Sequence, residues 1–80
     1  MLMGQLKVRF GTRLQTLRQK AGVTQEKLAD AMGLTVESIS NMERGIHGPK
    51  FDNIEKIAKV LGVPVKELFE FDATASPRRR

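Results

Sequence analysis

Four glycines divide the apolar pattern of this chain into short segments, and this division limits the folds that the chain can adopt. Gly22, Gly33, Gly45 and Gly62 each follow a stretch whose apolar residues recur three or four positions apart, which is the spacing of one face of an α-helix. Glycine readily takes the left-handed conformation that ends many helices. No alternation typical of β-strands stands out, so the sequence predicts short helices joined by short loops.

The first three predicted helices are marked by an apolar face or by a capping residue. Phe10, Leu14 and Leu17 lie at i, i+4 and i+7 of the first helix. Thr24 and Thr35 stand before the second and the third, where a hydroxyl oxygen can accept a hydrogen bond from a free backbone amide. We therefore expect the second and third helices to be capped by these threonines.

Two further helices are predicted after a loop at residues 46–49. A fourth helix comes first, and a fifth, short helix follows Pro64 with Leu68 and Phe69 as its anchors. The apolar residues on one side of the fourth helix are Phe51, Ile54, Ile57, Ala58 and Leu61. The expected fold class is all-α, a compact five-helix domain over residues 6–71, with a flexible N-terminus at 1–5 and a disordered basic tail at 72–80.

The chain is short and basic, and it has no cysteine. Its 80 residues suffice for one domain, and 14 Lys and Arg against 9 Asp and Glu give a net charge of +5, which favours a polyanionic partner. The lack of cysteine excludes disulfides, thiol catalysis and thiolate zinc sites. No apolar run approaches the ~20 residues of a membrane span, and we read no signal peptide. We therefore expect a cytoplasmic protein without membrane contact.

Residues 24–45, TQEKLADAMGLTVESISNMERG, are the most informative part of the sequence. The two short helices predicted here are joined only by residues 33–35, and such a tight turn crosses two helices at a steep angle. Ala29 is small where the helices must approach each other. The residues expected to fill the wedge between them are Leu28, Met32, Leu34, Ile39 and Met42.

In this segment the chain resembles the phage-repressor and Cro-like (XRE-type) helix-turn-helix family. The resemblance covers about Leu6 to Phe71 and includes TQEKLA, the turn at Gly33, SISNMERG and IAKVLGV, in the family's order and spacing. It implies a lambda-repressor-like DNA-binding domain whose second and third helices form the helix-turn-helix. The third helix would then lie in the major groove of duplex DNA.

The resemblance also implies roles for individual residues. The positions that would contact bases are Val36, Glu37, Ser40 and Asn41, and those that would contact phosphates are Thr24, Gln25, Thr35, Arg44 and Lys50. Asn41 would pair with adenine, Glu37 would accept from cytosine N4, and Val36 would touch a thymine methyl group. The acid at Glu37 and the basic Lys50, in place of a small polar cap, depart from the family's usual pattern.

A structural ion pair is implied as well, because Arg18 and Glu43 match positions that pair in some relatives. Catalysis is not expected: Ser38 and Ser40 lack a base or an oxyanion arrangement. His47 has no neighbouring ligands for a metal. We therefore expect no enzyme activity, no metal and no cofactor.

The function expected from these features is sequence-specific binding of double-stranded DNA by a small transcription regulator, a repressor. Such a protein would act as a homodimer on a two-fold symmetric operator. Residues 62–65, the fifth helix and Phe71 are the expected dimer contacts. The alternative is an antitoxin or an adaptor that acts mainly through a protein partner, although the sequence lacks an extra helix or arm that would wrap one.

Overall fold

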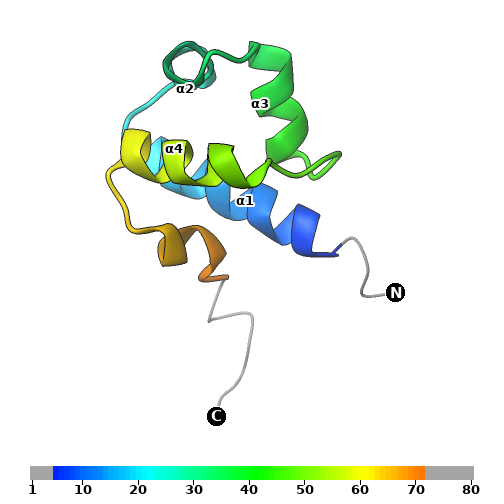
Figure 1. Cartoon of the computed structure of the whole chain (residues 1–80). Coiled ribbons are helices and arrows are strands. Elements are labelled where there is room, and N and C mark those ends of the chain that lie inside the picture. The colour runs from blue at the N-terminus through cyan, green and yellow to red at the C-terminus, as the bar shows by residue number, and fades with distance from the viewer. Residues whose placement is uncertain (1–4, 72–80) are drawn as a thin grey trace.

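The computed structural model describes residues 5–71, which form four α-helices and one 3-10 helix and contain no β-strand (Figure 1). The elements are α1 (Gln5–Lys20), α2 (Gln25–Met32), α3 (Val36–Glu43), α4 (Phe51–Leu61) and the 3-10 helix η1 (Val65–Phe69). The segments expected to be flexible, 1–5 and 72–80, lie outside the described residues except for Gln5, which begins α1. None of the described helices has the length and apolar character needed to cross a membrane.

The expectation of five α-helices is wrong, because the fifth element is the 3-10 helix η1. The amide of Glu67 donates to the carbonyl oxygen of Pro64 at 2.9 Å, and that of Glu70 donates to the carbonyl of Glu67 at 3.3 Å. These i to i+3 bonds define a 3-10 helix, which proteins use for short pieces of chain. The element contains only five residues, a length at which the tighter 3-10 form is common.

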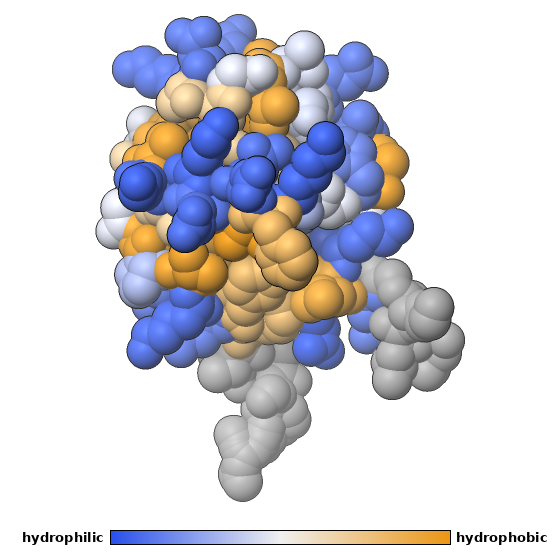
Figure 2. Space-filling model, in the orientation of Figure 1, coloured by the Kyte–Doolittle hydropathy of each residue, from blue (hydrophilic) through white to orange (hydrophobic). Residues whose placement is uncertain are grey.

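Contacts with α1 hold η1 in place. Arg13 donates from Nε to the carbonyl oxygen of Glu67 at 2.8 Å and from Nη2 to its carboxylate at 3.0 Å. Phe69 stacks at a tilt against Phe10, with 5.4 Å between the ring centroids. In Figure 2, apolar atoms gather below a central band of hydrophilic residues, on the side where η1 and the beginning of α1 lie.

Both helices of the predicted helix-turn-helix are capped as their sequence indicates. The hydroxyl oxygen of Thr24 accepts from the amide of Lys27, and that of Thr35 accepts from the amide of Ser38, each at 3.0 Å. Gly33 ends α2 in the left-handed conformation, with φ at 69°. A side chain there would strain the backbone, so Gly33 permits the abrupt turn into α3.

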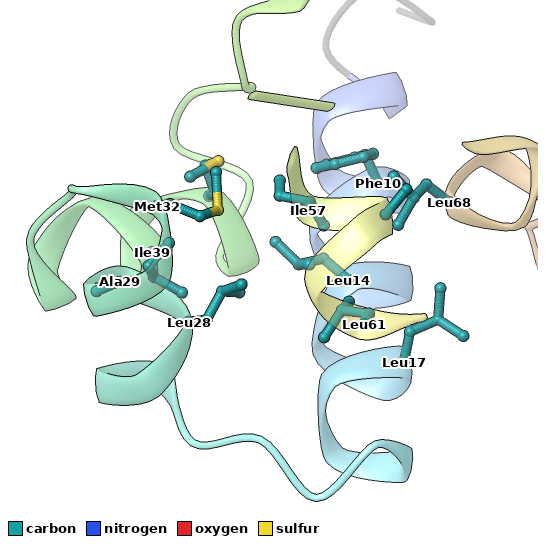
Figure 3. Packing of buried hydrophobic residues seen from close by; sticks show 12 residues of the cluster. Phe10, Leu14, Leu17, Leu28, Ala29, Met32, Ile39, Ile57, Leu61 and Leu68 are labelled. Carbon is teal, nitrogen blue, oxygen red and sulfur yellow. The ribbon is translucent and has the colours of Figure 1, made fainter. Parts of the chain in front are cut away.

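A single apolar core lies between all five elements. Figure 3 shows Leu28 and Ile39, from α2 and α3, directed towards Leu14 of α1 and Ile57 of α4, and all four are fully buried. Leu68 of η1 closes the core on the side of Phe10 (Figure 3). The core residues are Phe10, Leu14, Leu17, Leu28, Ala29, Met32, Ile39, Met42, Ile57, Ala58, Leu61 and Leu68.

The helix α1 passes very close to the end of α3, and Gly11 makes this possible. A β-carbon at Gly11 would lie 2.6 Å from the carbonyl oxygen of Glu43 and would also overlap the carbonyl oxygen of Met42. Backbone atoms cannot move aside as the end of a side chain can. The helical pattern of α1 does not reveal this contact, because it depends on which helix packs there.

One residue of the predicted apolar face of α4 is not part of the core. Phe51 was expected to lie with Ile54, Ile57, Ala58 and Leu61, but its side chain is 88% exposed. The other four residues pack in or against the core. Phe51 is the first residue of α4, and the first turn of the helix extends past the core.

Candidate nucleic-acid interface

The helix α3 is held from one side and leaves its opposite side open. Its buried residues are Ile39, Met42 and Glu43, and these face α1 and α2. In Figure 1, α2 and α3 lie together on one side of the crossed pair α1 and α4, with α3 at the edge of the molecule. The turn between them contains only residues 33–35. This arrangement is a helix-turn-helix with one helix placed to contact a partner.

The outward side of α3 and its cap carries the positions predicted to contact DNA. Val36 and Glu37 are exposed, Ser40 and Asn41 are half-buried, and Arg44, the C-cap residue, is exposed. Positions 36, 37, 40, 41 and 44 recur at the spacing of one helical face. The structure thus brings the expected base-contacting residues together on one surface.

Two of these residues are already joined to each other. Arg44 donates from Nη2 to Oδ1 of Asn41 at 2.9 Å. Bidentate recognition of adenine requires Oδ1 to accept from N6 and Nδ2 to donate to N7. Since an amide oxygen has two acceptor positions, Arg44 can keep its bond while Oδ1 accepts from a base. The two side chains thus contact each other on the outward face, a relationship that the sequence did not reveal.

The two threonine caps lie at the beginnings of α2 and α3, where free backbone amides and the helix dipole favour an anion. Thr24 and Thr35 are both exposed. Each hydroxyl oxygen accepts a backbone hydrogen bond, and each hydroxyl hydrogen is left to donate. This geometry suits the phosphate contacts expected of both residues.

The structure brings Arg18 and Glu43 together in a buried ion pair. Arg18 donates from Nε to Oε2 of Glu43 at 2.5 Å and from Nη2 to Oε1 at 3.2 Å. Its Nη1 donates to the carbonyl oxygen of Val23 at 2.8 Å. The side chains are only 10% and 3% exposed. The pair joins the end of α1 to the end of α3, as the resemblance implied.

Gln25, the first residue of α2, also belongs to this network. Its Nε2 donates to Oε1 of Glu43 at 2.9 Å. One of the two amide hydrogens is thereby used inside the protein, and the second is left for the phosphate contact expected of this residue. Sequence reasoning missed this bond because the two residues lie 18 positions apart on different helices.

The loop after α3 adds basic charge near the same side. Lys50 occupies the N-cap position of α4, but its side chain makes no capping hydrogen bond. Both Lys50 and His47 are exposed. Residues 44–51 contain no carboxylate. Within residues 5–71 there is no cluster of three His, Asp or Glu side chains placed to hold a metal ion. The exposed cation of Lys50 can attract a phosphate.

The pair α2 and α3, joined by a three-residue turn and with an outward polar face on α3, has the form of a helix-turn-helix. Comparison with known sequences agrees: the pattern of the helix-turn-helix family HTH_3 matches residues 14–68, and the chain belongs to this family. Among its relatives is Control protein C.BamHI of Bacillus amyloliquefaciens, which is 42% identical over 67 residues, or 82% of this chain and 83% of that protein. Another is the cryptic phage CTXphi transcriptional repressor RstR of Vibrio cholerae, 34% identical over 59 residues, which cover 74% of this chain and 53% of the repressor.

Solved structures show the same fold. The restriction-modification controller protein C.AhdI from Aeromonas hydrophila superposes with a TM-score of 0.73 at 40% identity, over 78% of this chain and 94% of that one. The hypothetical transcription factor NHTF from Neisseria superposes with a TM-score of 0.78 at 30% identity, over 90% and 84%. Together with the family match, these relatives identify the chain as a DNA-binding transcription regulator of the XRE (Cro/cI) type.

Proposed function

We propose that this chain regulates transcription by reading a specific duplex site with α3 in the major groove. The observation that carries the proposal is the outward face at positions 36, 37, 40, 41 and 44. It is polar apart from one valine, and it stands on a helix whose other side is locked into the core. Rigid support of this kind lets a few side chains discriminate between bases, while phosphate contacts supply affinity.

Each residue of the face has a proposed partner. Asn41 pairs with adenine, Glu37 accepts from cytosine N4, Val36 touches a thymine methyl group, and Ser40 contacts a neighbouring base edge. Phosphates are bound by Thr24, Gln25, Thr35, Arg44 and Lys50. The carboxylate of Glu37 repels phosphates, so a site that gives it no cytosine amine would be penalised, and this sharpens the choice of sequence.

We propose further that two copies bind a two-fold symmetric operator. The surface offered for self-association comprises residues 62–65, η1 and Phe71. Val65 and Phe69 are each about two-fifths exposed, and Phe71 lies against Phe69, with 6.3 Å between ring centroids. The guanidinium of Arg9 stacks over Phe71 at 5.9 Å. Exposed aromatic and arginine side chains of this kind are enriched in protein interfaces.

The likeness to control proteins suggests what is regulated. C.BamHI and C.AhdI match this chain at 42% and 40% identity over most of their own length, and C.AhdI is a restriction-modification controller protein. We propose that this chain controls restriction-modification genes, and that it represses them by occupying their promoter. A reporter gene placed behind the selected operator tests whether the protein represses or activates transcription, because repression predicts lower expression when the protein is present.

Selection of random duplex DNA by the purified protein at physiological salt, followed by sequencing of the bound pool, tests the proposal. Enrichment of a short two-fold symmetric motif, with half-sites about one helical turn apart, is the expected result. An unenriched pool that binds only through salt-sensitive attraction would overturn it. A protein partner would then have to be sought, as for an antitoxin or an adaptor.

A further inference from the structure

The first half of α1 contacts two different parts of the molecule, and the first of these is the end of α3. A β-carbon on Gly11 would lie 2.6 Å from the carbonyl oxygen of Glu43. Val8 lies against the loop that follows α3, since a β-carbon on Gly45 would be 2.9 Å from the Cα of Val8. This side of residues 8–13 is therefore packed directly against the end of the helix proposed to read DNA.

The same stretch of α1 also holds η1, which lies below α1 in Figure 1 while α3 lies above it. Leu68 of η1 is fully buried, and Phe69 stacks on Phe10 with 5.4 Å between the ring centroids. Arg13 donates to the carbonyl oxygen of Glu67 at 2.8 Å and to its carboxylate at 3.0 Å. Apolar contacts are non-directional, whereas a planar guanidinium that donates to two acceptors also restricts their direction. Arg13 is therefore the contact that restricts the angle of η1 on α1.

The pair of Arg13 and Glu67 differs from a solvated surface pair. The two side chains are 21% and 35% exposed, and the bond to the carbonyl oxygen does not depend on the charge of Glu67. Exposed ion pairs contribute little to stability, but a partly buried fork with a backbone acceptor holds both partners in one geometry. Gly11 and Arg13 are two residues apart, which is less than one turn of an α-helix. The angle of η1 is thereby tied to the end of α3 through a short, stiff piece of α1.

This connection matters for a dimer formed through residues 62–65, η1 and Phe71. The separation and the angle between the two copies of α3 would depend on how η1 sits on α1. Each base pair added between two half-sites moves one of them about 3.4 Å along the duplex and turns it by about 35° around the axis. A rigid connection between η1 and α3 therefore suits one spacing, and a loose connection would accept neighbouring spacings as well.

We propose that Arg13 determines which half-site spacing the protein accepts. It is a positioning residue that touches no DNA: it fixes η1 on α1 and so holds the two copies of α3 at one separation and one angle. This role rests on the proposed function and adds to it a determinant of specificity outside the helix-turn-helix. The bases of each half-site are still chosen by the outward face of α3.

The first experiment measures the affinity of the full chain for its selected operator and for operators whose spacer is one base pair longer or shorter. We expect the wild type to prefer the selected spacing by about tenfold or more, and Arg13→Met to reduce this ratio to about threefold or less. A loss of folded protein or of dimer affinity lowers binding at every spacing alike, so the ratio responds only to the geometry of the dimer.

Two further variants complete the set. Glu67→Ala removes the carboxylate and leaves the carbonyl oxygen in place, so its ratio should fall between those of the wild type and Arg13→Met. It also decides the question if Arg13→Met does not fold, as judged by circular dichroism. Lys56→Met removes a basic side chain from the exposed side of α4 and should keep the wild-type ratio.

A second experiment needs no DNA. The chain has no cysteine, so Glu37→Cys places one spin label on an exposed position of α3 in each copy. Pulsed electron paramagnetic resonance on the free dimer should give a narrow distribution of distances between the labels, and Arg13→Met should broaden it.

An unchanged spacing ratio in both Arg13→Met and Glu67→Ala, or a label distribution that stays as narrow in Arg13→Met, would overturn the inference. Neither result would affect the proposed function. If the wild type binds as a monomer or selects no symmetric motif, the proposed function itself fails, which is a different observation from a strict spacing that the variants preserve.

Discussion

The side-chain amide of Gln25 at the start of α2 donates to the carboxylate of Glu43 at the end of α3, across 2.9 Å. Glu43 also binds Arg18, so a single carboxylate connects three helices. It stands between a buried cation, which balances its charge, and a half-buried amide at the edge of the proposed DNA surface. If Gln25 binds a phosphate as proposed, stability and phosphate binding share this one carboxylate.

Arg18→Met should destabilise the fold strongly. Removing one partner of a buried ion pair leaves the other charge uncompensated, at a cost of ~3–5 kcal/mol. Urea unfolding followed by circular dichroism measures the loss. The double variant Arg18→Met, Glu43→Leu should recover most of the stability, because no buried charge remains. A single variant that unfolds at the wild-type urea concentration would show that the pair has no structural role.

Gln25→Ala should weaken binding to all duplexes by a similar factor, since the expected partner is a backbone phosphate. Affinities on the selected duplex and on a scrambled one measure this. Glu43→Gln removes the charge that holds the amide of Gln25, and it also leaves the buried Arg18 without its counter-charge, so affinities are compared only for protein that circular dichroism shows to be folded. If Glu43 acts on DNA through Gln25, the effect of Glu43→Gln on affinity should shrink in the Gln25→Ala background, whereas two independent effects would simply add.

Gly11→Ala brings in two effects that change the stability of the fold in opposite directions. Intrinsic helix propensity favours alanine by about 1 kcal/mol. The new β-carbon, however, would overlap the carbonyl oxygens of Met42 and Glu43, and overpacking of this kind costs about 1–3 kcal/mol or more. We expect a net loss of stability in thermal melting. Thr12→Ala, at an exposed neighbouring position of α1, is the control. An increase in melting temperature for Gly11→Ala would contradict the close packing of α1 on α3.

Asn41→Ala and Arg44→Ala should have different effects on DNA binding. The first should cost ~1–3 kcal/mol on the selected site and relax the choice at one base position. The second should weaken binding to selected and random DNA alike and reduce the salt slope by about one unit. Filter binding on both duplexes at several salt concentrations separates the two patterns. If the two variants behave identically, the proposed division between base and phosphate contacts is incorrect.

Local chemistry made much of the fold predictable. Thr24 and Thr35 cap their helices and Gly33 turns the chain, because each effect depends on a residue and its immediate neighbours. The apolar wedge between α2 and α3 followed from helical spacing in the same way. Gly11 and Phe51 could not be predicted. The space around Gly11 depends on where α3 passes, and the exposure of Phe51 depends on where the core ends along α4.

The candidate site was predictable to a similar extent. The resemblance indicated which positions face outward and that Arg18 and Glu43 pair. It did not indicate that Gln25 joins them or that Arg44 binds Asn41. Hydrogen bonds of this kind join neighbouring helices or successive helical turns, and their geometry is determined only when the side chains are placed.

The helix α3 has one buried face and one exposed face, and this affects how such proteins can diversify. The residues that fix the helix are Ile39, Met42 and Glu43, whereas Val36 and Glu37 are exposed and take no part in the core. Mutations at the outward positions can therefore accumulate with little loss of stability. If α3 reads DNA as proposed, new operator preferences become accessible to an unchanged scaffold by a few codon changes.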